Sequence, residues 1–250
     1  MRSPVDTIVA PPFPKDLAWV NSAPLHIAQQ ARHPVLIEFW DVCRPSSHRT
    51  LPYLRAWHRR YSDTGAGLRV IGVHSSALDA GHDEERVREA IDRMDIPYPV
   101  ALDPGFLLWR AYATPGWPSR YLFAPPLKLF DTHHGEGDYA GTERAIQELL
   151  DIDEPLVPLQ DATDDDDAPI VVPTADVAGA YTGDYAAGEV WVVVDRPGTV
   201  TVNGAPHVLD RMGAHRVIRH EGHTAGTVAI LAEPGVDVLG TAFLPGLAPQ

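Results

Sequence analysis

The chain has 250 residues, enough for one large core or for one medium and one small core. It carries 20 Lys and Arg against 34 Asp and Glu, and the formal net charge of −14 argues against nucleic acid or an anionic membrane as partner. A single cysteine excludes an internal disulfide, and no window has the apolar stretch of a secretory signal or a membrane span. We therefore expect a cytoplasmic protein.

The first third of the chain predicts a lead-in followed by a strand and a helix. Residues 1–33 are rich in proline and carry a short predicted helix at 25–31. The apolar run at 35–40 predicts a strand that is buried on both faces, with Glu38 as its exception. Apolar residues then recur at helical spacing over 47–61, which predicts a helix.

Strands and helices continue to alternate up to about residue 150. The predicted strands cover 68–74, 98–102, 120–123 and 127–130, and the predicted helices start at Asp83 and cover 106–112 and 142–150. This order predicts an α/β domain at 1–150, in which a mixed sheet has helices on both faces.

The composition changes after this domain. Residues 151–175 are acidic and contain proline, so we expect a solvated linker. A calcium site at Asp164–Asp167 is disfavoured, because contiguous carboxylates need a turn residue such as glycine to point inward together. Residues 176–250 show only strand and turn patterns, with Asn203-Gly204 as a strong hairpin signal, and predict a small all-β sandwich or jelly-roll module.

Several motifs in the first domain resemble those of a known family. They are Leu17–Asn21, Glu38–Trp40, Arg49–Leu54, Val70–His74, Trp109–Tyr112, Trp117-Pro118 and His133–Gly137. Together they resemble the thioredoxin superfamily over residues 12–150, more narrowly its TlpA-like and DipZ-type branch and the thioredoxin domains found beside NHL repeats. The resemblance implies a thioredoxin-like fold. The runs 219–226 and 234–236 resemble, more weakly, the jelly-roll module that follows the thioredoxin domain in DipZ-type proteins.

The expected C-x-x-C motif of that branch is degenerate here. Counting back five residues from Pro52 places the second cysteine at Ser47 and the first at Arg44, so Arg44-Pro45-Ser46-Ser47 replaces the dithiol. A second register shortens the loop by one residue and aligns Cys43–Ser46 as C-x-P-S, a monothiol variant. The gap-free register has neither thiol and the second register has only one, so dithiol exchange lacks thiols that it needs in both.

Cys43 and Arg44 are the candidate catalytic residues. A helix N-terminus and a neighbouring guanidinium both stabilise a thiolate, so both would lower the pKa of Cys43. The competing interpretation is that Cys43 is a small buried hydrophobic residue.

Further candidates come from the resemblance. It implies that Glu38 is the buried acid that shuttles a proton for the resolving cysteine, whose place Ser47 takes. It also implies that Trp117-Pro118 is the cis-proline element that pairs with the backbone of a polypeptide substrate, although a cis-proline can serve the turn alone. The candidate binding residues are Glu38, Trp40, Ser47, His74, Trp117 and Pro118.

We expect neither a metal nor a cofactor. Cys43, His48 and His74 are the alternative, a soft metal site or a thiol-base pair, if the fold brings them to one sheet edge. The remaining paired histidines, at 133–134 and 220–223, are expected at the surface.

The first functional hypothesis is a redox-inactive binding or partner module. The alternative is an enzyme, a monothiol oxidoreductase or peroxidase acting through Cys43. The expected partner is a protein, or a small thiol or peroxide, at the thioredoxin groove. A reactive Cys43 should be partly exposed, whereas a structural one should be sealed by Trp40 and Trp117.

Overall fold

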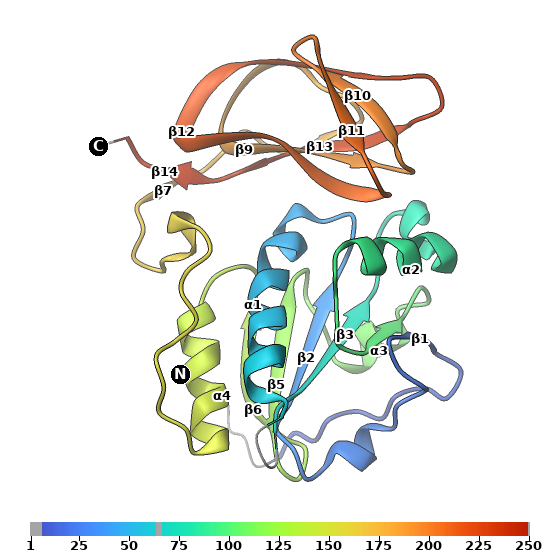
Figure 1. Ribbon diagram of the computed structural model, residues 1–250, viewed down its shortest axis with the longest axis vertical. Helices are drawn as coiled ribbons and strands as arrows, with labels where there is room; N and C mark the ends of the chain where they lie inside the picture. Colours follow the sequence, from blue (N-terminus) through green and yellow to red (C-terminus); the bar gives the residue numbers. More distant parts are fainter. Residues whose placement is uncertain (1–6, 64–66, 250) are drawn as a thin grey trace. The chain divides into compact units, whose positions relative to one another are not determined.

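The computed structural model describes residues 7–63 and 67–249, drawn in Figure 1. The chain divides into two compact units. Unit 1 comprises the chain up to Asp41, Arg49–Ala77 and Asp95–Gln160, and unit 2 comprises Val42–His48, Leu78–Met94 and the chain from Asp161. The loop Val42–His48, which follows the buried strand at 35–40, belongs to unit 2, whereas the residues on either side of it, Asp41 and Arg49, belong to unit 1.

Unit 1 is built on a six-stranded mixed sheet. Its strands are β1 (Ala18–Val20), β2 (Val35–Trp40), β3 (Arg69–His74), β4 (Val100–Leu102), β5 (Ser119–Ala124) and β6 (Lys128–His134). They lie in the order β1-β4-β3-β2-β5-β6, where β2, β3 and β4 are parallel to one another and the other pairs are antiparallel. The mixed sheet predicted from the sequence is confirmed.

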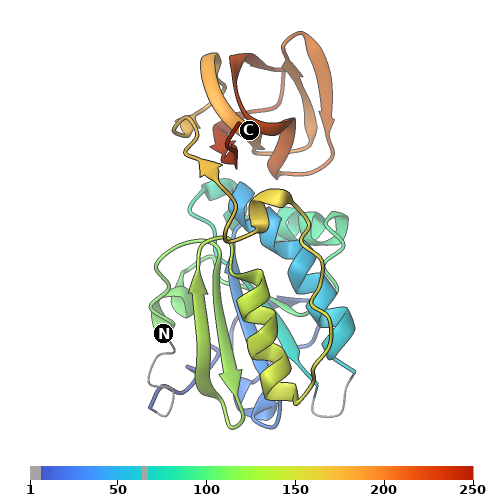
Figure 2. The ribbon, with the colours of Figure 1, turned by 90° about the vertical axis from the view of Figure 1, so that its left-hand side faces the viewer.

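Two helices, α1 (Pro45–Tyr61) and α4 (Tyr139–Leu150), cover one face of this sheet (Figure 2). The other helices of the chain are α2 (Glu84–Arg93) and α3 (Leu107–Ala111), with short 3-10 turns at Ile27–Gln30, Asp79–His82 and Ala162–Asp164. The helices α1 and α4 are in contact through the stacked rings of Tyr53 and Tyr139, whose centroids are 3.8 Å apart. Figure 2 shows α4 alongside the β5–β6 hairpin.

The opposite face is closed by α3 and by the lead-in. Leu108 of α3, Tyr112 directly after it, and Phe13 and Trp19 of the lead-in form one hydrophobic cluster with Phe39 of β2. The sheet therefore lies between two apolar layers. This explains why the run at 35–40 carries no alternation of polar and apolar residues.

The segment after α4, for which the sequence predicts a solvated linker, is largely exposed but is also hydrogen-bonded to unit 1. Over 151–160 it packs in unit 1, where the Val157 N–H donates to Glu143 Oε2 at 2.8 Å and the Gln160 N–H donates to the Tyr53 hydroxyl at 2.8 Å. Beyond it, the Asp161 carboxylate caps the turn Ala162–Asp164. The physical reason is that buried side chains of the first domain offer acceptors to this backbone.

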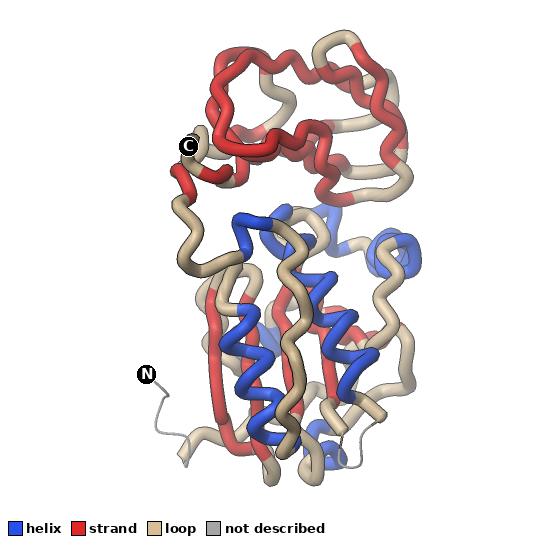
Figure 3. Tube along the Cα trace, turned by 60° about the vertical axis from the view of Figure 1, so that its left-hand side comes forward, coloured by secondary structure: helices blue, strands red, loops and turns tan. Residues whose placement is uncertain are grey.

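From Ile170 onward the described chain forms only strands, turns and loops, as Figure 3 shows in red and tan. The strands are β7 (Ile170–Val171), β8 (Val177–Ala178), β9 (Thr182–Val194), β10 (Gly198–Val202), β11 (Ala205–Leu209), β12 (Gly213–Ala232), β13 (Val238–Leu244) and β14 (Gly246–Leu247). Six of them form an antiparallel sheet in the order β11-β10-β12-β9-β13-β8, and β7 pairs with β14. The Asn203-Gly204 hairpin is confirmed, with φ values of 50° and 80° that suit a tight turn.

A buried aspartate fastens α3 at the end of β4. The Asp103 carboxylate is fully buried and accepts from the N–H groups of Leu107 at 2.7 Å and Trp109 at 3.0 Å. It thereby satisfies two donors at the start of a short helix that has no side-chain cap of its own.

We expect Asp103→Ala to lower the free energy of unfolding by about 2–4 kcal/mol, because it leaves those N–H groups without their acceptor. Asp92→Ala, the same change on the exposed side of α2, should cost less than about 0.5 kcal/mol. Urea unfolding followed by fluorescence measures both. Equal losses in the two variants would contradict this role of Asp103.

Candidate functional site

The structure divides the predicted site residues between the two units. Unit 1 holds Glu38, Trp40, His74, Trp117 and Pro118, and unit 2 holds Cys43, Arg44 and Ser47. Each group is described within its own unit.

In unit 2 the loop Val42–His48 is fastened to the long strand β12. The Val42 carbonyl accepts from the Ala214 N–H at 2.9 Å and from His48 Nε2 at 2.7 Å. Gly213, with a φ of 101°, leaves room for this approach, since a Cβ there would lie 2.5 Å from the Val42 oxygen. The loop Val42–His48 is thus part of the packing of unit 2.

His48 is held as a neutral ring in this packing. Burial, Arg211 and His215 lower the pKa of His48 to about 3, against a smaller opposing effect of its bond to the Val42 carbonyl. The ring also lies edge-on to Trp191, with centroids 5.6 Å apart. His48 therefore serves the loop as a hydrogen-bond donor and not as a cation.

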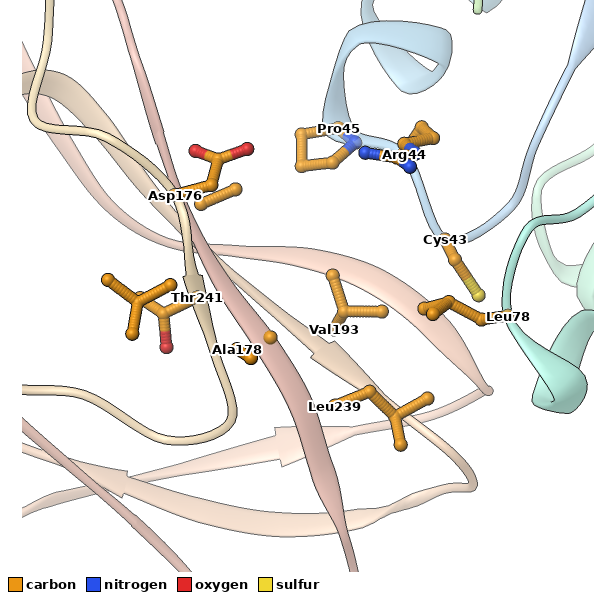
Figure 4. Close-up of a pocket in the computed structure, with 12 residues that line it drawn as sticks. Cys43, Arg44, Pro45, Leu78, Asp176, Ala178, Val193, Leu239 and Thr241 are labelled. Carbon is orange, nitrogen blue, oxygen red and sulfur yellow. The ribbon is translucent and has the colours of Figure 1, made fainter.

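Cys43 lines a cavity of about 200 Å³ in unit 2. The cysteine is only 3% exposed, and Figure 4 shows its sulfur pointing toward Leu78. The remaining wall is largely apolar and comes from Arg44, Pro45, Asp176, Val177, Ala178, Val193, Leu239, Gly240, Thr241 and Ala242. Small side chains on β8 and β13 leave the room that the cavity occupies.

Two polar groups of this wall bond to the backbone of unit 2. Asp176 Oδ1 accepts from the Phe243 N–H at 3.0 Å, and Thr241 Oγ1 donates to the Gly179 carbonyl at 2.9 Å. Arg44 is exposed. It lines the same cavity as Cys43, so the two residues predicted as catalytic lie at one site. Such a cavity suits a small, mostly apolar group beside a thiol.

Ser47 occupies a fully buried position. It is in the first turn of α1, where its N–H donates to the Arg44 carbonyl at 3.0 Å. In the gap-free register the place of the resolving thiol is therefore buried, while the place of the attacking thiol, at Arg44, is exposed.

In unit 1 the structure brings Trp40 and His74 together. Their ring centroids are 5.0 Å apart, and His74 Nε2 lies 3.9 Å from Asp41 Oδ1. Over the described ranges, no three His, Cys, Asp or Glu side chains gather closely enough to hold a metal ion. Of the alternative metal set, Cys43 and His48 belong to unit 2, where His48 Nε2 donates to the Val42 carbonyl, and His74 belongs to unit 1, where it lies beside Asp41.

Glu38 is fully buried on the face of the sheet that α1 covers. Its Oε1 accepts from Thr50 Oγ1 at 3.0 Å. Burial raises the pKa of Glu38 to about 7, although Arg120 and the bond from Thr50 act in the opposite direction.

The sequence interpretation missed Arg120. It is 2% exposed and is the cross-strand partner of Glu38, on β5. The available signal was a charged residue within the otherwise largely apolar run 119–124, at a position whose side chain points to the same face as Leu122.

Trp117-Pro118 forms a cis peptide and belongs to an aromatic surface of unit 1. The Trp117 ring packs on Trp109 with centroids 4.3 Å apart, and Phe106 lies edge-on to both indoles. The adjacent Leu107 is 51% exposed. Phe106 itself has a φ of 55°, a conformation that costs free energy for a bulky residue.

Comparison with solved structures identifies the fold of the first domain. A solution structure of a thioredoxin-like protein in its oxidised form matches with a TM-score of 0.52 and 22% identity, over 58% of this chain and 97% of that chain. The chain has a thioredoxin-like fold. It shares this fold with thiol-disulfide oxidoreductases, but it contains a single cysteine.

Curated relatives match a similar share of the chain. DipZ of Mycobacterium bovis is 31% identical over 153 residues, 60% of this chain and 22% of that protein. SUPPRESSOR OF QUENCHING 1 of Arabidopsis thaliana is 32% identical over 138 residues, 55% of this chain and 13% of that protein. This thioredoxin-like chain thus spans less than a quarter of the length of either relative.

No family model matches the chain. Within residues 7–63 and 67–249, none of the helices combines the length and the apolar character that crossing a bilayer requires.

The stability of the thioredoxin-like chain should depend on pH through Glu38. Its native pKa, about 7, lies above the ordinary value of 4.5, so the native state binds more protons than the unfolded state between these pH values. This contribution to the free energy of unfolding is complete at low pH and falls by about 3 kcal/mol as pH rises through that window.

Glu38→Gln should remove this dependence. We expect the free energy of unfolding of the parent chain, measured relative to that of the variant, to fall by about 3 kcal/mol from pH 4.5 to pH 7, as measured by urea unfolding at each pH. Parallel stability curves for the two proteins would show that Glu38 titrates normally.

Proposed function

We propose that this chain is a thioredoxin-fold binding module that does not carry out dithiol exchange. The observation that carries the proposal is the state of the motif, where Arg44 and Ser47 stand in the thiol positions and the one cysteine is only 3% exposed. A thiol that attacks an external disulfide needs access and a stabilised thiolate. The packing of Val42–His48 in unit 2 supports a structural role for this loop.

The aromatic surface of unit 1 supports a binding role. Trp117 and Pro118 are retained, and Phe106, Trp109 and the exposed Leu107 extend an apolar surface beside them. Aromatic residues are frequent anchors in protein interfaces. We infer that a polypeptide partner binds this aromatic surface.

The proposed compartment is the cytoplasm. The one cysteine can form no internal disulfide, so the chain gains no covalent stability from an oxidising environment.

A second candidate function is monothiol chemistry at Cys43. It is favoured by the cavity of about 200 Å³ that Cys43 and Arg44 line together. In that reaction the Cys43 thiolate would attack a small disulfide, form a mixed disulfide with one half and release the other half as a thiolate. With hydrogen peroxide, the thiolate would attack one oxygen and become a sulfenic acid. The O–O bond would break, and the second oxygen would leave as hydroxide or, once protonated, as water.

Alkylation of Cys43 separates the two functions. In the binding module, iodoacetamide at pH 8 should modify folded Cys43 at least about 100-fold more slowly than the urea-unfolded chain, because the folded thiol is buried. The matched control is Cys43→Ala with Arg44→Cys, which moves the thiol to the adjacent exposed position and should react at nearly the unfolded rate. Fast reaction of folded Cys43 would favour monothiol chemistry instead.

A restored dithiol tests the register. Arg44→Cys with Ser47→Cys should give a chain that reduces insulin disulfides, since it places one thiol at an exposed position and one at a buried position. The matched alternative is Ser46→Cys, which gives Cys43 a second thiol at C-x-x-C spacing in the other register. Activity of the Ser46→Cys chain, with none from a well-folded Arg44→Cys, Ser47→Cys chain, would reverse our alignment.

A further inference from the structure

Four polar side chains are buried together at the centre of the unit 1 sheet. Glu38, Trp40 and Tyr98 are fully buried, and Arg120 is 2% exposed. Five of their polar atoms have no hydrogen-bond partner in the part of the chain that the structure describes: Glu38 Oε2, Trp40 Nε1, the Tyr98 hydroxyl, and Nε and Nη1 of Arg120. Buried polar atoms in native proteins are nearly always bonded, either to protein or to ordered water.

The sheet register places these groups around one point. Glu38 on β2 pairs with Gly72 on β3 and with Arg120 on β5, so all three lie on the same face. A Cβ at Gly72 would lie 3.1 Å from Trp40 Nε1 and 3.3 Å from Cε2 of the Tyr98 ring. The indole and the phenol therefore close over Gly72, next to Glu38.

Glu38 and Arg120 face each other without a direct bond among the described residues. The other oxygen of Glu38 is engaged by Thr50 of α1. Arg120 donates through Nη2 to the Gly137 carbonyl, and its guanidinium stacks on the Tyr139 ring at 4.9 Å. These contacts engage Nη2 and one face of the guanidinium, and they leave Nε and Nη1 buried without a partner among the described residues.

The unpartnered atoms are mostly donors. Trp40, Tyr98 and Arg120 offer N–H or O–H groups, whereas Glu38 Oε2 accepts when it is ionised. Ordered water fits this pattern, because each water molecule can accept from two donors and donate to a carboxylate oxygen, so two water molecules suffice for the four donor atoms. We propose that Glu38 and Arg120 form a buried ion pair bridged by ordered water, in a chamber closed by Trp40 and Tyr98.

This assigns Glu38 a role that needs no second cysteine. As the water-linked counter-ion of Arg120, the carboxylate neutralises a guanidinium that is otherwise isolated in the core, where an unpaired charge is costly. The proposal is independent of the binding function, because it concerns only the interior of unit 1. Glu38 and Arg120 are then positioning residues for the sheet.

A high-resolution crystal structure at pH 8 tests the bridge directly. We expect a water oxygen within about 2.7–3.2 Å of both Glu38 Oε2 and a nitrogen of Arg120. A direct Glu38–Arg120 bond, or a halide in place of the water, would overturn the proposal.

Titration of the Glu38 carboxyl by ¹³C NMR provides a second test. Tyr98→Phe removes one donor to the water network and should raise the Glu38 midpoint by about 0.5 or more, because the carboxylate loses stabilisation. The matched control is Tyr112→Phe, which removes the buried hydroxyl that bonds to the Pro11 carbonyl in the other core. An unchanged midpoint in Tyr98→Phe, or an equal shift in Tyr112→Phe, would contradict the water-bridged chamber.

Discussion

The complete burial of β2 is the constraint on which the rest of unit 1 depends. All six residues from Val35 to Trp40 are fully buried, with β3 paired on one side and β5 on the other. Each large apolar side chain in such a strand contributes about 1.5–3 kcal/mol through its removal from water. The same burial places the Glu38 carboxyl where its charge is expensive, which explains both its raised pKa and the opposing guanidinium of Arg120.

The loop after β2 takes part in the packing of unit 2. In thiol-disulfide exchange this loop must present one thiolate and protect another. Here Ser47 is buried, Cys43 is nearly inaccessible, and the Val42 carbonyl is bonded to β12 and to His48. The loop thereby contributes Cys43, Arg44 and Pro45 to the wall of a small, largely apolar cavity in unit 2.

Sequence patterns predicted the parts of the molecule that local physics controls. The apolar run of β2, the helical spacing of α1 and the Asn203-Gly204 turn each depend on neighbours in the chain, and the structure confirms all three. The placement of Glu38 in a buried strand was also predictable. Its counter-ion was not, because Arg120 comes 82 positions later and meets Glu38 only through the β2–β5 register.

The candidate site was predictable as a set of residues but not as an arrangement. Cys43 and Arg44 are neighbours in the sequence and were predicted together. The rest of the cavity wall comes from β8, β9 and β13, and no local motif predicted that these strands would line it. His48 was expected near the thiol as a base or ligand, whereas its ring donates to the Val42 carbonyl. Such long-range bonds depend on the packing of unit 2, and a single sequence carries no periodic signal for them.

The most direct test of the account is the intact mass of the folded chain after exposure to oxidised glutathione or to hydrogen peroxide. The account predicts an unchanged mass, because the Cys43 thiol is only 3% exposed and is therefore protected from both reagents. Stoichiometric addition of glutathione or of oxygen to Cys43 in the folded chain would contradict it and would establish this thioredoxin-like chain as a monothiol redox protein.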